Sequence, residues 1–363
     1  MTNYHYLMNL MRGQPGSGLD LLVGDEAHLA ESIFRDHRTL RYATLGSRLG
    51  IGLIEHQKAI NFLEKHISKY YDDEREAAKL DLEEDDNDVV EAKLTEKEKR
   101  NIRIKRLYRG IETLTGRKKD DWICVIEPKK SNLLIIPIRN YWPAVRGLYL
   151  SATIFDPMVT EPFGRTAYIR LPSTFPAANR PVISLDGGRL SFKATPETWT
   201  GMYNLLDTVI SQMGNRQGII HTPSYKMAET ILTTSRYSAI METHGSGGRD
   251  EAVANFKLKK KQILVSPAVA EGVDFPGDEC EWQIIPKLPF PDLQDIVSSS
   301  IYKATPGLTD VTVARKIVQM AGRGVRSETD TCTTFILDTN FRWFYRNNVS
   351  KFPQWFRDAV STG

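Results

Sequence analysis

The chain has 363 residues, of which 41% are hydrophobic and 26% charged, with 48 Lys and Arg against 45 Asp and Glu. This composition is typical of a globular protein and excludes disordered and fibrous classes, and the length suggests two domains at roughly 100–200 residues each. Because the net charge is only +3, any nucleic-acid surface must come from local clustering of basic residues.

Further classes of protein are excluded by what the sequence lacks. No stretch approaches about 18 uninterrupted apolar residues, which excludes an ordinary transmembrane helix. Residues 1–10 have neither the basic region nor the apolar run of a secretory signal. The cysteines Cys124, Cys280 and Cys332 form no CxxC pair, so neither a disulfide framework nor a cluster of four cysteine ligands is possible within this chain. We expect a soluble, cytoplasmic protein without iron–sulfur ligands.

The first predicted element is a short buried strand at residues 19–23, followed by Asp25-Glu26-Ala27-His28. Residues 53–119 differ from the rest because apolar residues are sparse and helically spaced. An acidic stretch at 72–91 and a basic stretch at 97–109 lie within them. This pattern predicts two helices joined by an acidic connection, forming a helical insertion.

Strands are predicted again at 122–126, 133–138 and 147–150, and Pro and Gly residues then indicate a linker at 166–180. Helix and strand alternate in the remainder, which predicts a mostly parallel sheet with helices on both faces. The residues Trp343-Phe344-Tyr345 are predicted to pack in the core beneath the last helix. The predicted helices are 196–213, 249–257 and 312–321, and the predicted strands are 218–221, 262–265, 282–285 and 333–337.

Two polar clusters follow strands of the first half. Asp25-Glu26 after an apolar strand is the Walker B arrangement, in which the first carboxylate holds Mg²⁺ and the second activates the attacking water. The alternative is an exposed acidic turn. Ser151 and Thr153 either hydrogen-bond a carboxylate or cap the following helix.

Two more clusters lie in the second half. Ser266 precedes Glu271-Gly272-Val273-Asp274-Phe275, where the glycine permits close backbone approach and Asp274 can accept a ribose hydroxyl or pair with an arginine. In Gln319-Met320-Ala321-Gly322-Arg323-Gly324-Val325-Arg326 the two arginines suit contacts with phosphate. The alternative is a pair of surface arginines at a helix end, which the helix dipole favours.

The order of these clusters resembles motifs II, III, V and VI of superfamily 2 helicases, and His221-Thr222-Pro223-Ser224 resembles motif IV. The segment Thr2-Asn3-Tyr4-His5-Tyr6-Leu7, the helical insertion and residues 271–275 narrow the resemblance to the XPD/DinG family of DNA helicases. This resemblance covers essentially the whole chain. It implies an α/β fold with two RecA-like parallel-sheet domains, the first incomplete. Residues 1–52 and 120–165 would belong to the first domain, 53–119 to an Arch-like insertion and 181–363 to the second domain.

The family resemblance implies an ATP-dependent helicase or translocase that moves 5′→3′ on single-stranded DNA in replication, recombination or repair, in a bacterium or phage. ATP would sit between the two domains, Asp25 would bind Mg²⁺ and Glu26 would act as the base. The γ-phosphate would be contacted by Gln319, Arg323 and Arg326. Coupling of nucleotide to movement would involve His28, Ser151, Thr153, Gly272, Asp274 and Gly322. DNA contacts are predicted at Asn3, Tyr4, Thr222, Ser224, Ser266, Arg103 and Tyr108. For the last two the alternative is a solvated face that neutralises the acidic stretch.

The sequence departs from the family in one respect, because Gly-Lys-Ser or Gly-Lys-Thr occurs nowhere in it. The glycine-rich residues 13–18 lack the lysine and precede a strand, so they are not a phosphate-binding loop. We expect that a separate polypeptide supplies the Walker A segment, and retention of Asp25, Glu26, Arg323 and Arg326 favours this. Alternatively, the chain is a catalytically incomplete nucleic-acid-binding subunit, or a DEAH-type translocase of a restriction system, which would not need the helical insertion.

Overall fold

The computed structural model divides the chain into two compact units. Unit 1 consists of Met1–Ala152, Met158–Thr166 and Asp292–Pro306, and unit 2 of Thr153–Pro157, Ala167–Pro291 and Gly307–Gly363. The structure describes residues 22–24, 27, 33, 35–36, 38–43, 49–72, 96–128, 132–139, 147–153, 167, 169–191, 193–270 and 272–362. We describe each unit by itself.

Unit 2 is built on a seven-stranded sheet in which every pairing is parallel, with the order β13-β7-β12-β11-β8-β10-β9. The expected parallel sheet is therefore present. Its strands are β7 (Val182–Ser184), β8 (Gly218–His221), β9 (Met241–Glu242), β10 (Ile263–Ser266), β11 (Trp282–Ile285), β12 (Thr333–Ile336) and β13 (Val360–Thr362).

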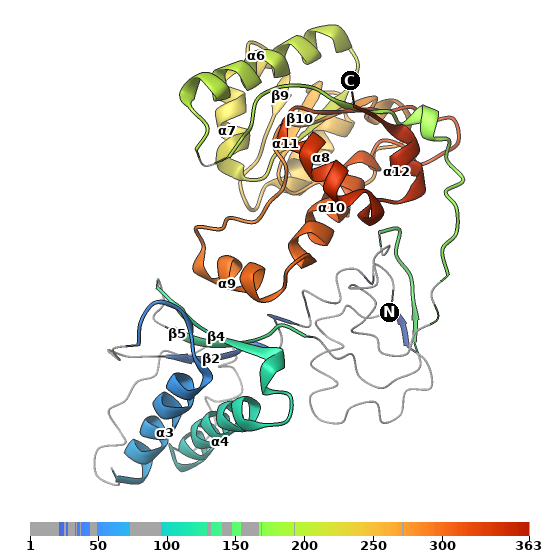
Figure 1. The fold of residues 1–363 in the computed structure, drawn as a ribbon. Helices are drawn as coiled ribbons and strands as arrows, with labels where there is room; N and C mark the ends of the chain where they lie inside the picture. Colours follow the sequence, from blue (N-terminus) through green and yellow to red (C-terminus); the bar gives the residue numbers. More distant parts are fainter. Residues whose placement is uncertain are drawn as a thin grey trace. The chain divides into compact units, whose positions relative to one another are not determined.

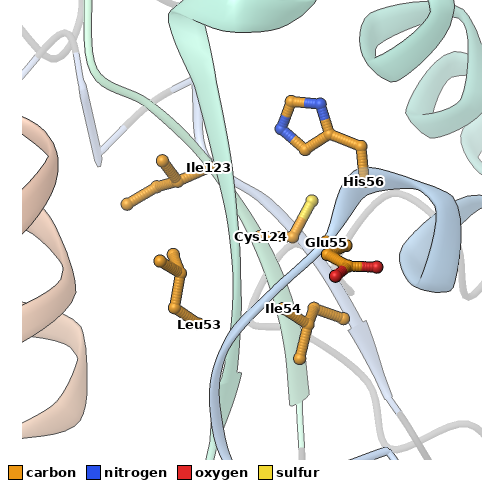
Figure 2. Close-up of a pocket in the computed structure, with 6 residues that line it drawn as sticks. All are labelled: Leu53, Ile54, Glu55, His56, Ile123 and Cys124. Carbon is orange, nitrogen blue, oxygen red and sulfur yellow. The ribbon is translucent and has the colours of Figure 1, made fainter.

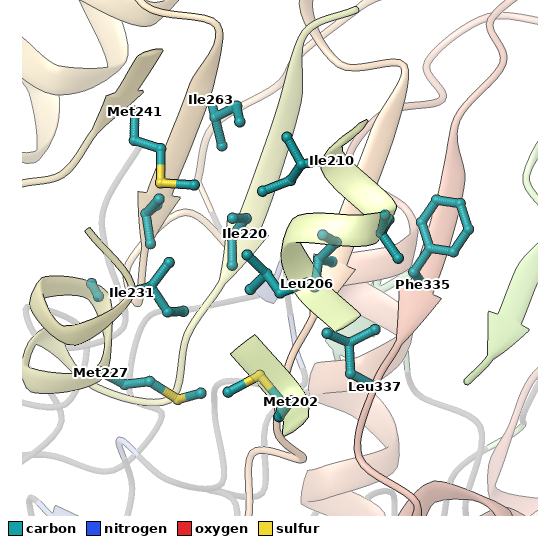
Figure 3. Close-up of a cluster of buried hydrophobic side chains, with 14 of the residues drawn as sticks. Met202, Leu206, Ile210, Ile220, Met227, Ile231, Met241, Ile263, Phe335 and Leu337 are labelled. Atoms are coloured by element: carbon teal, nitrogen blue, oxygen red, sulfur yellow. The ribbon is translucent and has the colours of Figure 1, made fainter. Parts of the chain in front are cut away.

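Helices cover both faces of this sheet. Successive strand residues point to opposite sides, and they pack against different helices. Ile220, Ile284 and Phe335 pack in one cluster with α6 and α7, and Figure 3 shows this core. Residues one position away, such as Ile285 and Ile336, pack in another with α10, α11 and α12. The helices of unit 2 are α6 (Pro196–Met213), α7 (Tyr225–Thr234), α8 (Arg249–Lys257), α10 (Leu308–Ala321), α11 (Asn340–Asn348) and α12 (Gln354–Ala359).

Local sequence explains the bounds of α6 and the packing of β8. Thr195 caps α6 by accepting a hydrogen bond from the Thr198 N–H, and Pro196 occupies the first turn, where its missing N–H costs nothing. In β8, Gly218 lies opposite Trp282 of β11, and a Cβ at Gly218 would fall 2.0 Å from the indole ring. The sheet therefore needs a glycine here in order to bury the tryptophan.

Unit 1 contains a four-stranded antiparallel sheet with the order β2-β5-β4-β3. Helices α3 and α4 lie side by side against it (Figure 1), and their apolar residues join one buried cluster with the sheet. Helix α9 packs on β3 and β4, and its apolar residues join a second cluster that includes Ile123 and Val125. The elements are β2 (Leu40–Ala43), β3 (Gly52–Ile54), α3 (His56–Asp72), α4 (Glu96–Thr115), β4 (Trp122–Glu127), β5 (Asn132–Pro137) and α9 (Ile296–Ala304).

A second, two-stranded parallel sheet in unit 1 joins β1 (Leu22–Gly24) and β6 (Gly147–Tyr149). The structure therefore groups segments differently from the sequence-based division. The strands at 122–137 pair with residues 40–54 under the helical pair, whereas we assigned them to the first parallel-sheet domain. Residues 292–306 lie within unit 1, whereas we assigned 181–363 to one domain. Residues 169–180, part of the predicted linker, belong to unit 2, and the Arg180 guanidinium stacks 3.8 Å above the Trp355 ring.

Candidate functional site

Two loops of unit 2 meet around the side chain of Arg323. The first loop follows β10, and the second, residues 322–330, follows α10. Arg323 is only 8% exposed, and its Nε donates to the Ala270 carbonyl at 2.6 Å while Nη1 donates to the Val273 carbonyl at 3.0 Å. Because a guanidinium presents its donors in a rigid fork, these main-chain acceptors fix Arg323 and the first loop relative to each other.

Asp274 faces both arginines of the second loop. Its Oδ1 lies 3.4 Å from Arg323 Nη1 and also accepts a hydrogen bond from Arg326 Nη2. The Asp274 side chain is 61% exposed and that of Arg326 38%, so the pair contributes little to stability by itself. Two guanidinium groups against one carboxylate leave a net positive charge, and a partly exposed arginine beside it suits a phosphate ligand.

Gly272, Gly322 and Gln319 lie on the segments that carry these three residues. Gly272 has φ +75, a left-handed conformation that favours glycine, and a Cβ there would meet nothing within 4 Å. Its conformation is therefore what requires glycine. Gly322 is the C-cap of α10, and Gln319 lies buried in the last turn of that helix, four residues before Arg323. Glu271 lies outside the described residues.

A buried polar network that the sequence did not reveal lies on the α10 side of the sheet. His221 Nε2 hydrogen-bonds Gln283 Oε1 at 2.9 Å, and Gln283 Nε2 donates to Ala321 O and Thr334 Oγ1, both at 3.4 Å. The pKa of His221 is lowered to about 4, mainly by burial; the Gln283 hydrogen bond opposes this shift and the positive charge of Arg323 contributes to it. His221 is therefore neutral near pH 7. The single polar residue inside the apolar strand Trp-Gln-Ile-Ile was the available signal for Gln283.

The predicted DNA contacts Thr222, Ser224 and Ser266 lie together where β8 and β10 end. The Thr222 N–H donates to Ser266 O at 3.1 Å, and Ser224 caps α7 by accepting the Met227 N–H at 3.2 Å. His244, which we did not predict, hydrogen-bonds Ser266 Oγ through Nε2 at 2.7 Å. Sequence resemblance thus located this cluster, but it missed the histidine from the neighbouring strand β9.

In unit 1, Ala27 lies beside the residue that follows β6. Leu22 pairs with Gly147 in parallel register, and beyond the strands the Ala27 N–H donates to Leu150 O at 2.9 Å. This contact places the Ala27 backbone next to Leu150, the residue that precedes Ser151. Ser151 is half-buried and Thr153 buried. The predicted site residues Asn3, Tyr4, Asp25, Glu26 and His28 lie outside the described residues.

The two DNA contacts predicted on α4 do not share one face. Five positions separate Arg103 and Tyr108, which places them about 140° apart around the helix. Tyr108 is 44% exposed, while Arg103 is half-buried.

On α11, Phe344 is fully buried as expected, but Trp343 is 63% exposed. Arg346 lies one turn beyond it and is also exposed.

A pocket of about 310 Å³ in unit 1 is unrelated to the predicted residues. Figure 2 shows its lining by β3, β4 and the start of α3, mainly through Leu53, Ile54, Ile123 and Cys124. Within the described ranges, no three His, Cys, Asp or Glu side chains come together as a metal site. None of the helices in those ranges is long and apolar enough to span a bilayer.

Comparison with known proteins agrees with these arrangements. Residues 208–359, which contain Asp274, Gln319, Arg323 and Arg326, match the family model of the helicase C-terminal domain. The fold is similar to that of S. tokodaii Xpd4, with a TM-score of 0.54 at 14% identity over 99% of this chain and 81% of that chain. The chain resembles the XPD/DinG helicases. The expected α/β class with a RecA-like parallel sheet is thereby confirmed.

A sequence relative of this XPD/DinG-like chain is the ATP-dependent DNA helicase CHL1 of Candida glabrata. The two are 25% identical over 193 residues, which make up 44% of this chain and 23% of that protein. An XPD helicase structure also aligns, with a TM-score of 0.42 at 13% identity over 91% of this chain and 67% of that chain. The aligned region therefore spans only a minor part of the curated relative.

Proposed function

We propose that this chain is the C-terminal part of an ATP-dependent DNA helicase that moves 5′→3′ along single-stranded DNA. The observation that carries the proposal is the meeting of Asp274, Arg323 and Arg326 in one pair of loops. These loops lie inside the region that matches the helicase C-terminal domain. The DNA substrate and the direction of movement rest on the resemblance to the XPD/DinG family.

In this proposal Arg323 and Arg326 neutralise charge on the γ-phosphate during its transfer. Such arginines are worth about 10³–10⁵ in turnover. Gln319 contacts the phosphate or the attacking water, while Asp25 holds Mg²⁺ and Glu26 activates that water. Bound Mg²⁺ would neutralise the phosphate oxygens. The net positive loop pair, with Arg326 partly exposed, fits an anionic ligand. Coupling to movement is assigned to His28, Ser151, Thr153, Gly272, Asp274 and Gly322.

Single-stranded DNA would contact the exposed Ser224, while the buried Thr222 and Ser266 would support the backbone around it. Asn3, Tyr4, Arg103 and Tyr108 are further proposed contacts. Single-strand channels combine basic residues with aromatic platforms on which bases stack. The exposed Trp343, with Arg346 one turn further along α11, has this character.

A separate polypeptide would supply the Walker A segment and with it the remaining phosphate contacts. The 363 residues contain no Gly-Lys-Ser or Gly-Lys-Thr, so these contacts need residues outside this sequence. The same observation favours one second candidate, a catalytically incomplete subunit that binds nucleic acid without hydrolysing ATP.

The test is ATP turnover by the purified chain, alone and with a candidate Walker A polypeptide, in the presence and absence of oligo-dT. The variants are Glu26→Gln and Arg326→Ala, and the matched control is Arg249→Ala, whose side chain pairs only with the adjacent Asp250 among the described contacts. We expect turnover to fall about 10³-fold in Arg326→Ala with oligo-dT binding retained. Unchanged turnover in Arg326→Ala would overturn the assignment. DNA binding without turnover in any mixture would support the incomplete subunit.

A further inference from the structure

Asp330 hydrogen-bonds the backbone of its own loop, residues 322–330, which we call the arginine loop. Asp330 is 8% exposed. Its Oδ2 accepts the N–H groups of Arg326 at 2.7 Å and Ser327 at 2.9 Å, and its Oδ1 accepts the Ser327 hydroxyl at 2.7 Å. Burial would raise the pKa of Asp330, but the hydrogen bonds from Ser327 and from the N–H groups of Arg326, Ser327 and Gly277 outweigh it and lower that pKa. A charged carboxylate therefore holds the main chain at Arg326.

Lys257 organises the opposite loop in a comparable way. It is the last residue of α8, and its Nζ donates to the Asp274 carbonyl at 2.6 Å and to Glu279 Oε2 at 2.7 Å. The ammonium also lies 5.2 Å from the centre of the Phe275 ring, within the range of a cation–π contact. Three contacts from one side chain thus hold the Asp274 carbonyl, the Phe275 ring and the Glu279 carboxylate.

The arginine loop is also packed tightly against the residues beneath it. A Cβ at Gly324 would fall 2.3 Å from Cys332 Sγ and 2.7 Å from the Cys280 carbonyl. The loop therefore rests directly on the residues that precede β11 and β12. Its position depends on contacts at its sides, because it has no room to move inward.

We propose that Asp330 and Lys257 are positioning residues that hold the arginine loop and residues 272–279, the Asp274 loop, in a fixed position relative to each other. A continuous series of contacts runs from Asp330 to the Arg326 backbone, from the Arg326 guanidinium to Asp274, and from Asp274 to Lys257. Neither residue lies in a helicase motif. The inference rests on the proposed function for its purpose, because a group that acts on a transferring phosphate must be held to within about 0.5 Å.

Amide hydrogen exchange by mass spectrometry on the full chain tests the locking without nucleotide or DNA. We expect Asp330→Ala to speed exchange about tenfold in peptides covering 322–330 and also in those covering 272–279, although the second set is some 50 residues away in sequence. Asp330→Asn should restore most protection, because its amide oxygen can still accept the two N–H groups. Lys257→Met should speed exchange in both sets as well. The matched controls are Glu328→Gln, on the exposed side of the same loop, and Lys260→Met, whose Nζ contacts Asn255 instead.

The two sets of peptides decide the outcome. Faster exchange confined to 322–330 in Asp330→Ala, and to 272–279 in Lys257→Met, would overturn the proposal because each residue would then support only its own loop. If Asp330→Ala fails to fold, Lys257→Met alone decides in the same way. Where turnover is observed, Asp330→Ala should lower kcat about tenfold while KM for ATP changes less than about twofold. Absence of turnover would count against the proposed function and leave the exchange result standing.

Discussion

The two large sheets of this chain bury different chemistry. The seven-stranded parallel sheet of unit 2 carries His221, Gln283 and Thr334 on the face toward α10, all nearly inaccessible. The four-stranded antiparallel sheet of unit 1 is packed on both faces by apolar clusters in the part that the structure describes. Buried polar groups are costly unless they are hydrogen-bonded. Their concentration beside the end of α10 shows that unit 2 replaces part of its apolar core with a hydrogen-bonded polar network.

The contrast also explains how each sheet tolerates change. A buried polar network is stable only when every hydrogen-bonding partner is present, whereas an apolar core is stable when its volume is filled. Substitutions that alter volume should therefore be felt in both sheets. Changes of pH should separate them, because the buried ionisable groups differ.

The largest effect is expected at Gly218, where the seven-stranded sheet has no space. Gly218→Val would drive its side chain into the Trp282 ring, where even a Cβ falls 2.0 Å from the indole. We expect the free energy of unfolding to fall by about 4 kcal/mol or the chain not to fold. Urea denaturation measures this. Gly201→Ala, at an open position in α6 with nothing within 4 Å, should instead stabilise by about 0.5–1 kcal/mol. Equal tolerance of both changes would contradict the packing of Trp282.

In the four-stranded sheet, the comparable change removes volume. Leu133 is fully buried between β4 and the helical pair α3 and α4. Leu133→Ala should cost about 3 kcal/mol through lost burial and the cavity left behind. Amide exchange should then rise in peptides of β4, β5 and α4, while peptides of β8 and β11 keep their protection. Equal loosening of both sheets would show that they do not differ as local units of stability.

Part of the secondary structure and pairing in both sheets could be predicted from the sequence. The parallel sheet followed from βα alternation, and α6, α8, β8 and β11 begin and end at the predicted residues because caps and apolar runs mark them. The antiparallel hairpin was available as well. Only four residues, 128–131, separate β4 from β5, and a parallel crossover needs a dozen or more. Its pairing with residues 40–54 could not be predicted, because β2 and β3 are short and lack clear alternation.

The site shows a similar division. The arginines and Asp274 were found because motif order marks them, and the structure brings them into contact. Lys257, Gln283 and His244 act through partners that are distant in sequence. Asp330 instead contacts Arg326 and Ser327 within its own loop, and no motif marks any of these four residues. A lone Gln in a strand or a Lys at a helix end has many ordinary explanations, and only the fold selects among them.

Acid should weaken unit 2 through His221. Its native pKa of about 4 lies below the ordinary histidine value of about 6.5. Between these values the unfolded chain binds the proton and the native chain does not, so stability falls as pH falls. At about pH 4.5 the loss should reach about 2 kcal/mol relative to pH 7. Urea denaturation of the wild type and His221→Gln at both pH values isolates this contribution. The same acid sensitivity in both proteins would contradict the burial of a neutral imidazole.

The smallest effect, with the opposite pH sign, is expected in unit 1. Tyr42 is 9% exposed, and its hydroxyl donates to the Arg106 carbonyl at 2.8 Å. Burial raises its pKa to about 12, although Arg106 and Arg109 partly oppose this. Since the unfolded value is about 10, the stabilisation is complete below pH 10 and is lost as pH rises toward 12. At about pH 11 the wild type should lose about 1 kcal/mol that Tyr42→Phe keeps. Cys124, whose pKa burial also raises to about 12, is present in both proteins, so its contribution cancels in this difference. An alkaline loss that is identical in both proteins would place the Tyr42 hydroxyl in water and remove the contrast between the two sheets.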